Sequence, residues 1–294
     1  MELERWSELS AAVSAVAAEF ERHPGDTYST AAIVRVHLRA ALFDRPTSWA
    51  CRAKNWKPSA RPAGLPDQST MSRRTRRDDF ESFLRRVGER LGGRAAPGPV
   101  RVVDGKPLEL PNHTTDRDAT RGRGVGRTSV GYKIHAVFSG GAMPDAFAIT
   151  TPAVPEKDMA ARMVGRLGGH GYLPADAHFD ASWLFDYCRH HGFQLVCPRA
   201  KPGTGIGHHY VSPHRLRAIE MLEPPAGVNT FGLDLYAGRT DIERQFAQLV
   251  CFGGGPTTLP PWVRRIWRVR NWVMAELLIN AARIRINRKA ALSA

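Results

Sequence analysis

The chain has 294 residues, a formal net charge of +14 and a hydrophobic fraction of 43%. That apolar content is enough for a buried core and excludes wholesale disorder, while the length allows one large domain or two smaller ones. A protein this basic usually meets a polyanion, and nucleic acid is the first candidate.

The sequence shows no sign of a membrane span or of export. It holds no run of about 18 apolar residues, and its acidic, amphipathic N-terminus lacks the pattern of a signal peptide. The four cysteines lie far apart and lack zinc-site spacing: Cys51, Cys188, Cys197 and Cys251. They are typical of reduced core residues, so we expect a cytoplasmic protein without a membrane partner.

Residues 1–92 predict an all-helical domain. Apolar residues recur at helical spacing over three stretches, residues 9–20, 29–42 and 69–91. Ser69 or Thr70 is the expected N-cap of the third helix.

Basic residues gather at the start of this third helix, at Arg73, Arg74, Arg76 and Arg77. Short helices joined by turns, with arginines on one of them, suit a helix-turn-helix DNA-binding domain. The alternative is a small helical bundle whose arginines are only solvated.

After a Gly- and Pro-rich linker at residues 93–99, the pattern changes to short strands and helices. Strands are expected at residues 100–105, 130–138, 146–150, 171–176 and 193–197, and helices at 156–167, around 183–188 and at 262–289. Polar stretches at residues 112–130 and 200–230 predict loops, the first of them mobile. The order of elements predicts an α/β domain over residues 100–290, with a mixed five-stranded sheet flanked by helices.

The stretch from Tyr236 to Phe246 combines three polar residue types that suit a site on DNA. On a helix, at about 100° per residue, Tyr236, Arg239 and Glu243 fall within roughly a 60° arc. A carboxylate there can bind a hard metal ion, and an Arg and a Tyr beside it suit a phosphate and a stacked base. The alternative is an ordinary Arg–Glu pair on a solvated helix.

Two aspartates end short predicted strands, Asp104 and Asp176. Carboxylates at strand ends, brought together by the fold and joined by Glu243, could bind two metal ions about 4 Å apart. Such a pair of ions supports phosphodiester chemistry. Taken singly, each Asp could instead be a cap or a turn former.

Five short motifs in this order resemble the DDE transposases of bacterial insertion sequences, which have a ribonuclease-H-like catalytic core. They are Val103-Asp104-Gly105, residues 131–135, residues 151–158, residues 175–180 and the Tyr-x2-Arg-x3-Glu signature at Tyr236, Arg239 and Glu243. Residues 65–73 are also similar to the start of the family's DNA-binding helices. The separation from Asp176 to Glu243, 243 − 176 = 67 positions, indicates the compact subgroup without a large β-rich insertion.

The resemblance implies a role for each signature residue. Asp104, Asp176 and Glu243 would be catalytic and would hold two Mg²⁺ ions, for which Mn²⁺ can substitute. Arg239 would hold a phosphate or a displaced nucleotide, and Tyr236 would contact DNA near the transposon end.

Other basic residues are expected to contact DNA as well. The set comprises Lys133, His135, Arg121, Arg123, Arg127, Arg73, Arg74 and Arg77. A solvated strand face is the alternative for Lys133 and His135.

Three further groups of residues are expected to be structural. Asp158 and Asp180 are interpreted as caps. The histidines at positions 208, 209 and 214 are interpreted as residues of a solvated loop, and Trp262, Trp267 and Trp272 as helix packing.

The function implied is a metal-dependent DNA transposase of the bacterial cytoplasm, associated with the nucleoid. It would bind terminal inverted repeats as a homodimer in the active complex, cleave at the element ends and join the 3′-OH ends to target DNA. Val250 departs from the family, which has a DNA-contacting Lys at this position. Two alternatives remain: a ribonuclease-H-fold nuclease without strand transfer, and a domesticated DNA-binding protein without catalysis.

Overall fold

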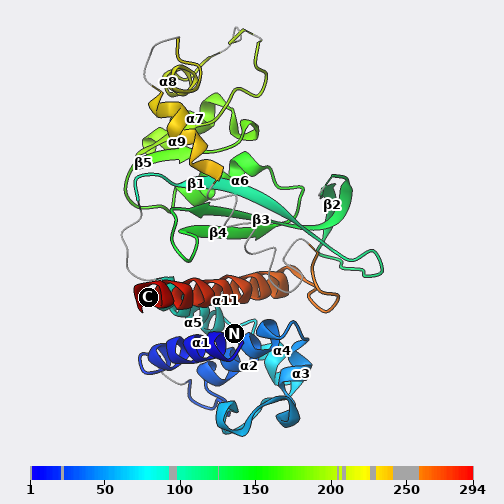
Figure 1. Cartoon of the computed structure of the whole chain (residues 1–294). Helices are drawn as coiled ribbons and strands as arrows, with labels where there is room; N and C mark the ends of the chain where they lie inside the picture. The colour runs from blue at the N-terminus through cyan, green and yellow to red at the C-terminus, as the bar shows by residue number, and fades with distance from the viewer. Residues whose placement is uncertain are drawn as a thin grey trace. The chain divides into compact units, whose positions relative to one another are not determined.

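A computed structural model describes residues 2–20, 23–92, 98–124, 126–203, 205–206, 210–225, 230–240 and 258–293. The chain forms two compact units (Figure 1). The first comprises Met1–Ala95, Pro111–Asp116 and Phe252–Ala294, and the second comprises Ala96–Leu110 and Arg117–Cys251. Each unit is described by itself below.

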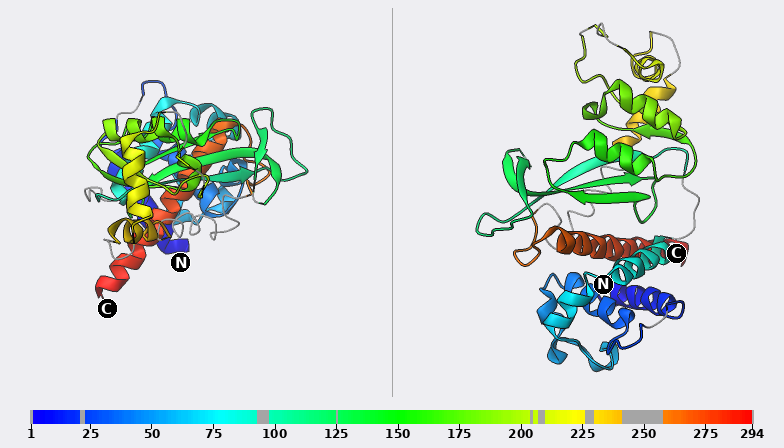
Figure 2. Two further views of the ribbon diagram at one scale, coloured as in Figure 1. Left: turned by 90° about the horizontal axis from the view of Figure 1, so that it is seen from above. Right: turned by 180° about the vertical axis from the view of Figure 1, so that it is seen from behind.

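The first unit is helical. Its α-helices are α1 (Glu2–Ala17), α2 (Thr30–Leu42), α3 (Thr47–Ala50), α4 (Gln68–Arg74), α5 (Asp78–Gly92) and α11 (Ile266–Ser293), with short 3-10 turns η1 (Ala53–Asn55) and η2 (Pro58–Ala60). The long helix α11 packs against α1, α2 and α5 (Figures 1 and 2). Most residues of α11 between Val269 and Ala282 are buried.

This packing bears on the expected domain division. The first two predicted helices are present as α1 and α2, but the C-terminal helix α11, which we expected within the domain of residues 100–290, belongs to the helical unit. The helix also starts later than the predicted residue 262, at Ile266, because Arg265 adopts a φ of 77° that a helix cannot accommodate.

The predicted third helix is in fact two helices. The chain leaves helical geometry after Arg74, turns over residues 75–77 and resumes as α5 at Asp78. The N-cap of α4 is Asp67, whose carboxylate accepts the Thr70 N–H at 2.7 Å, and neither Ser69 nor Thr70 takes this role. An ionised Asp suits this position because it also faces the positive end of the helix dipole.

The second unit contains a four-stranded antiparallel sheet. Its strands are β1 (Val102–Glu109), β2 (Thr120–Arg123), β3 (Thr128–Phe138) and β4 (Ala146–Thr150). The predicted hairpin of β3 and β4 is confirmed. Strand β3 pairs with β1 along one edge and with β2 and then β4 along the other, which makes it the central strand (Figure 1).

A parallel pair of strands, β5 (Gly171–Pro174) and β6 (Phe193–Val196), lies beside the start of β1. The connection is a single parallel bridge, Val100↔Tyr172, in which the Arg101 N–H donates to the Tyr172 carbonyl at 2.9 Å. Gly171 permits this approach, because its φ is 144° and a Cβ there would lie 1.9 Å from the Pro99 oxygen. The unit is therefore a mixed α/β structure, with the strands in two bridged sheets where one five-stranded sheet was predicted.

Helices complete this unit: α6 (Glu156–Val164), η3 (Ala177–Phe179), α7 (Ser182–His190), α8 (Pro213–Leu222) and α9 (Phe231–Ala237). Helix α6 packs on β3 and β4, while α7 and α8 pack on β6, over a core that includes Val103, Phe185 and Leu195. Helix α8 corrects the prediction of a loop over residues 200–230. It begins with Ser212 as the N-cap and Pro213 in its first turn, a combination that favours helix starts.

None of the helices within the described ranges is long and apolar enough to cross a membrane. Cys51, Cys188 and Cys197 are free thiols, as predicted, and Cys251 lies outside the described residues.

Candidate active site

Asp104 is half-buried on β1. The Gly105 N–H donates to its carboxylate at 2.8 Å. Burial raises the pKa of Asp104 to about 6; the Gly105 N–H and the Arg239 guanidinium oppose this rise, and the carboxylates of Asp176 and Glu156 add to it. Two other carboxylates and one arginine, from three separate stretches of the chain, therefore lie close enough to Asp104 to change its pKa.

The register of the strands explains why Asp104 and Asp176 meet. Val100 pairs with Tyr172 in parallel, an offset of 172 − 100 = 72 positions. Asp104 and Asp176 have the same offset, 176 − 104 = 72, so each lies four residues beyond the bridge on its own segment. The two predicted catalytic aspartates therefore leave the bridge in the same direction, and Asp176 is near enough to raise the pKa of Asp104.

Asp176 is fixed by its own turn. It is the N-cap of η3, and its carboxylate accepts the His178 N–H at 2.9 Å. The His178 ring lies against the same carboxylate, with Nδ1 at 3.4 Å from an Asp176 oxygen. On the other side of the ring, Arg123 Nη1 lies 3.3 Å from His178 Nε2. The side chain of Asp176 is still one-third exposed, so a ligand can reach it.

Glu156 is a site residue that sequence reasoning missed. It is the first residue of α6, it acts on the pKa of Asp104, and it forms an ion pair with Lys133 on β3. A glutamate at a helix start directly after a β-hairpin was the available signal, but a first-turn acidic residue is ordinary there. The ammonium of Lys133, predicted to contact DNA, is instead paired beside the acidic cluster.

Tyr236 and Arg239 lie together at the end of α9. The helix ends at Ala237, and the Arg239 guanidinium carbon lies 5.4 Å from the centre of the Tyr236 ring. Arg239 also lowers the pKa of Asp104, which places its charge within reach of the acidic cluster. Tyr236 and Arg239 therefore lie near Asp104, but they do not share the continuous helix on which the predicted arc was based, because α9 ends at Ala237.

The third predicted carboxylate, Glu243, lies outside the described residues, as does Val250. Across the described part of the chain, His, Cys, Asp and Glu form no metal-binding group of three or more. The described portion of the predicted site thus consists of Asp104 and Asp176, with Glu156 nearby.

His135 does not face solvent as predicted. Its side chain is 2% exposed and hydrogen bonds to the Thr150 hydroxyl at 2.8 Å, because β3 is the central strand and both of its faces are covered. Burial, with Lys133 as a second cause, lowers the pKa of His135 to about 4, so the ring is neutral. His135 is a core residue of the sheet and is not exposed to DNA.

Asp180 is structural, but its side chain does not cap a helix as predicted, because α7 begins after Ala181 and the carboxylate binds elsewhere. Its carboxylate accepts hydrogen bonds from the Arg215 guanidinium at 2.5 and 2.8 Å and from the Ala200 N–H at 2.9 Å. Burial opposes ionisation, but these bonds outweigh it and lower the pKa of Asp180 below its usual value. Of the three predicted loop histidines, His214 lies in α8, and the other two are outside the described residues.

The predicted arginines near β2 are exposed. Arg121 and Arg123 lie on β2 itself, which corrects the prediction of a mobile loop over residues 112–130, and Arg127 follows it. Arg123 reaches His178, whereas Arg127 pairs with Glu109 at 3.8 Å. A row of guanidinium groups therefore leads to the Asp176 side of the site.

The arginines of the helical unit divide into two kinds. Arg74 is 5% exposed and forms ion pairs with Asp26 at 3.1 Å and Asp79 at 3.6 Å, so it is not available to DNA as predicted. Arg77 is one-third exposed and is bound by the same two aspartates. Arg73 is exposed.

Comparison with known proteins identifies the family. The Transposase DDE domain family matches residues 95–258, more than half of the chain. The chain belongs to the DDE transposase family. The match includes both strand-end aspartates and all of the Tyr-x2-Arg-x3-Glu signature.

DDE transposases are metal-dependent enzymes that cut and join DNA, and this chain is a DNA transposase of that general kind. Among solved structures, a piggyBac transposase in a synaptic complex with hairpin DNA is 11% identical, with a TM-score of 0.49 over 98% of this chain and 74% of that one. No curated protein matches the sequence.

Proposed function

We propose that this DDE transposase binds the terminal inverted repeats of its element, hydrolyses the phosphodiester bonds at the ends and joins the 3′-OH ends to target DNA. Asp104 and Asp176, with Glu243, are the catalytic carboxylates. The reaction handles two ends, so two copies of the chain act together, on DNA of the bacterial nucleoid.

The observation that supports this proposal most is the meeting of Asp104 and Asp176 at equal register on neighbouring parallel segments. Strand-end caps would have no reason to coincide in this way. A third carboxylate, Glu156, acts on the same point, and the pKa of Asp104 is raised to about 6. Burial is the main cause of this rise, and the two neighbouring carboxylates add to it.

This donor set fits a divalent cation. Carboxylate oxygens are the ligands that Mg²⁺ prefers in proteins, and the residues that would hold it are Asp104, Asp176 and Glu243. Bound there, two Mg²⁺ ions would supply Lewis-acid activation of the attacking oxygen and charge neutralisation at the leaving oxygen.

The chain's own side chains position the DNA. Arg239, beside Asp104, is placed to hold the phosphate next to the scissile bond, and Tyr236, whose ring lies near that guanidinium, to stack on an adjacent base. Arg121 and Arg123 on β2 follow the backbone away from the site. Exposed Arg73 is the remaining candidate among the three predicted DNA-contacting arginines of the helical domain.

A strand-transfer assay tests the proposal. Purified protein, labelled DNA carrying the ends of its element, a target plasmid and Mg²⁺ are incubated together, and the products are separated on a denaturing gel. A transposase gives label covalently joined to the plasmid, and EDTA prevents this. Cleaved ends without joined products would indicate the nuclease alternative, and binding without cleavage would indicate the non-catalytic one.

A further inference from the structure

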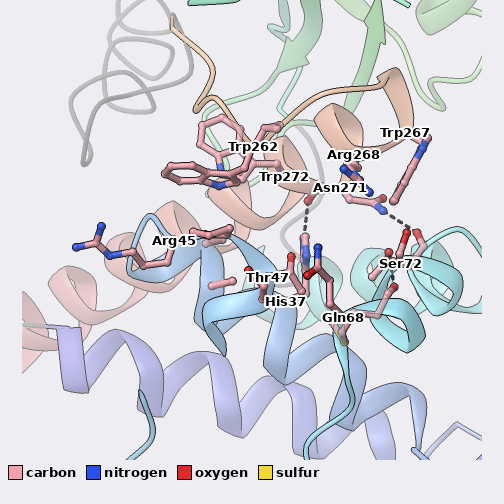
Figure 3. Close-up of a pocket in the computed structure, with 17 residues that line it drawn as sticks. His37, Arg45, Thr47, Gln68, Ser72, Trp262, Trp267, Arg268, Asn271 and Trp272 are labelled. Atoms are coloured by element: carbon pink, nitrogen blue, oxygen red, sulfur yellow. Dashed lines mark hydrogen bonds between the residues drawn. The ribbon is translucent and has the colours of Figure 1, made fainter. Parts of the chain in front are cut away.

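The helical unit contains a second polar site, which the cleavage chemistry does not use. A pocket opens between the end of α2, α3, α4 and the start of α11 (Figure 3). Three tryptophans line it, Trp262, Trp267 and Trp272, and we call it the tryptophan pocket. Trp272 is 7% exposed and packs as predicted, whereas Trp262 and Trp267 are partly exposed where they line the pocket.

The charge around this pocket has one sign. Its described lining includes Arg45 and Arg268, both exposed, and no Asp or Glu. Two guanidinium groups lie over the Trp267 ring, with the central carbon of Arg268 at 4.9 Å and that of Arg76 at 4.8 Å from its centre. Burial lowers the pKa of Arg268, and so do the like charges of Arg76 and Arg264. Arg76 and Arg268 are thus held close together over Trp267, and the charge of Arg264 is near enough to act on Arg268.

The floor of the pocket is rigid because its polar groups are bound within the fold. The Asn271 amide donates to the Thr75 carbonyl at 2.7 Å, and the buried His37 ring bonds the Asn271 carbonyl at 3.1 Å. At the rim, Gln68 is exposed and its amide can both donate and accept hydrogen bonds (Figure 3). The pocket therefore combines fixed aromatic walls, an amide at the edge and clustered guanidinium groups.

An unpaired nucleotide satisfies all three features together. Its base stacks on an aromatic ring, the base edge meets the amide, and the adjoining phosphate neutralises the clustered arginines. An apolar peptide segment would leave the arginines uncompensated. An acidic peptide would leave the exposed ring faces unused.

We propose that the tryptophan pocket binds an unstacked base of a DNA strand, with the neighbouring phosphate on Arg76, Arg264 and Arg268. The inference rests on the proposed function only in that DNA is the partner. It adds a site for single-stranded or locally unpaired DNA, within the helical unit.

Binding to a defined probe tests this site without any cleavage. A ten-nucleotide single-stranded DNA carrying one 2-aminopurine is titrated with the full chain in EDTA, and its anisotropy and emission are recorded. Base stacking is worth about 1–3 kcal/mol per base, so Trp267→Ala should weaken binding about 5- to 150-fold, and Trp267→Phe should restore most of it. Stacking in the pocket should also quench the 2-aminopurine emission in wild type and not in Trp267→Ala.

Matched controls separate the pocket from general charge and folding effects. Trp183→Ala removes an exposed tryptophan of α7, and Arg85→Ala an exposed arginine of α5; both should bind the probe as wild type does. Wild-type affinity in Trp267→Ala, or an equal loss on the fully paired duplex, would overturn the proposal. Because no cleavage is measured, a chain without strand-transfer activity would still give a decisive result here.

Discussion

The molecule has two clusters of like charge, one in each unit, and they are opposite in sign. Asp104, Asp176 and Glu156 gather at the sheet, and burial and neighbouring carboxylates raise the pKa of Asp104. Around Trp267, three arginines gather, and burial and neighbouring guanidinium groups lower the pKa of Arg268. In both clusters the fold holds charges together at a cost, and a ligand of the opposite sign would offset it.

A third charged group shows the alternative. Arg74 and Arg77 meet Asp26 and Asp79 at 3.0 to 3.6 Å, so that positive and negative charges alternate and no ligand is called for. The sequence shows arginine clusters in both places. Only the structure shows that the arginines of one cluster form ion pairs within the fold. Paired arginines stabilise the fold, whereas unpaired arginines can bind a ligand.

The largest effect is expected where a carboxylate of the acidic cluster is neutralised. Asp104→Asn or Asp176→Asn should reduce end cleavage by about a thousandfold or more, because metal-assisted charge stabilisation is worth several kcal/mol. DNA binding in a mobility-shift assay should change little. The control is Asp158→Asn, an exposed carboxylate on α6, which should cleave normally. Normal cleavage by Asp104→Asn or Asp176→Asn would show that the acidic cluster is not the active site.

The internally paired arginines should matter for stability. Arg74→Ala removes a buried guanidinium that pairs with Asp26 and Asp79, which keep Arg77 as a partner, and should lower the free energy of unfolding by about 1–3 kcal/mol. Arg73→Ala, one residue away and exposed, should change it by less than about 0.5 kcal/mol. Urea denaturation of both variants measures the difference. Equal free energies of unfolding in the two variants would show that the ion pairs of Arg74 do not stabilise the helical unit.

The buried Glu276, close to a second carboxylate, should make the stability of the protein depend on pH. Burial raises the pKa of Glu276 on α11 to about 8, and the Asp44 carboxylate adds to the shift. The folded state therefore holds a proton that the unfolded state has released between about pH 4.5 and 8. Stability from this group is complete at low pH and falls by about 1.4 kcal/mol per pH unit over that window.

Glu276→Gln should remove this part of the slope. Unfolding free energies measured by urea at several values between pH 5 and 8 would show it, with the exposed Glu89→Gln of α5 as the control. A slope identical to that of wild type would show that Glu276 stays ionised in the folded protein.

The smallest effect concerns single phosphate contacts. Arg123→Ala near the acidic cluster and Arg264→Ala beside the tryptophan pocket should each weaken DNA binding only a few-fold. Each should reduce the slope of log affinity against log salt by about one, the value for one lost phosphate contact. An unchanged slope for either variant would remove that arginine from the DNA interface.

Much of the fold could be predicted, because periodicity reports burial. The β3–β4 hairpin and helices α2, α6 and α7 lie where the pattern predicted them, within a few residues. Strand β2 was missed because its Thr-Arg-Gly-Arg sequence has no apolar alternation; pairing with β3 holds it in place. Helix α8 was missed because, of its residues, only Ala218 is buried.

The site was predicted in part for the same reason. The aspartates end strands, and strand ends are visible in the sequence, but the equal register that joins them depends on the bridge at Val100. Burial of His135 could not be foreseen, because a polar residue on an alternating strand normally faces water, whereas both faces of β3 are covered at this position. The pairing of Lys133 with Glu156 likewise depends on where α6 starts.

Asp104, Asp176 and Glu243 are proposed to hold the divalent cations of this DDE transposase together. Mn²⁺ binding to the full chain with DNA present, followed by electron paramagnetic resonance, tests it directly. Wild type and Asp158→Asn should bind Mn²⁺ alike, and Asp104→Asn, Asp176→Asn and Glu243→Gln should each lose most of it. Undiminished binding in those three variants would contradict the account.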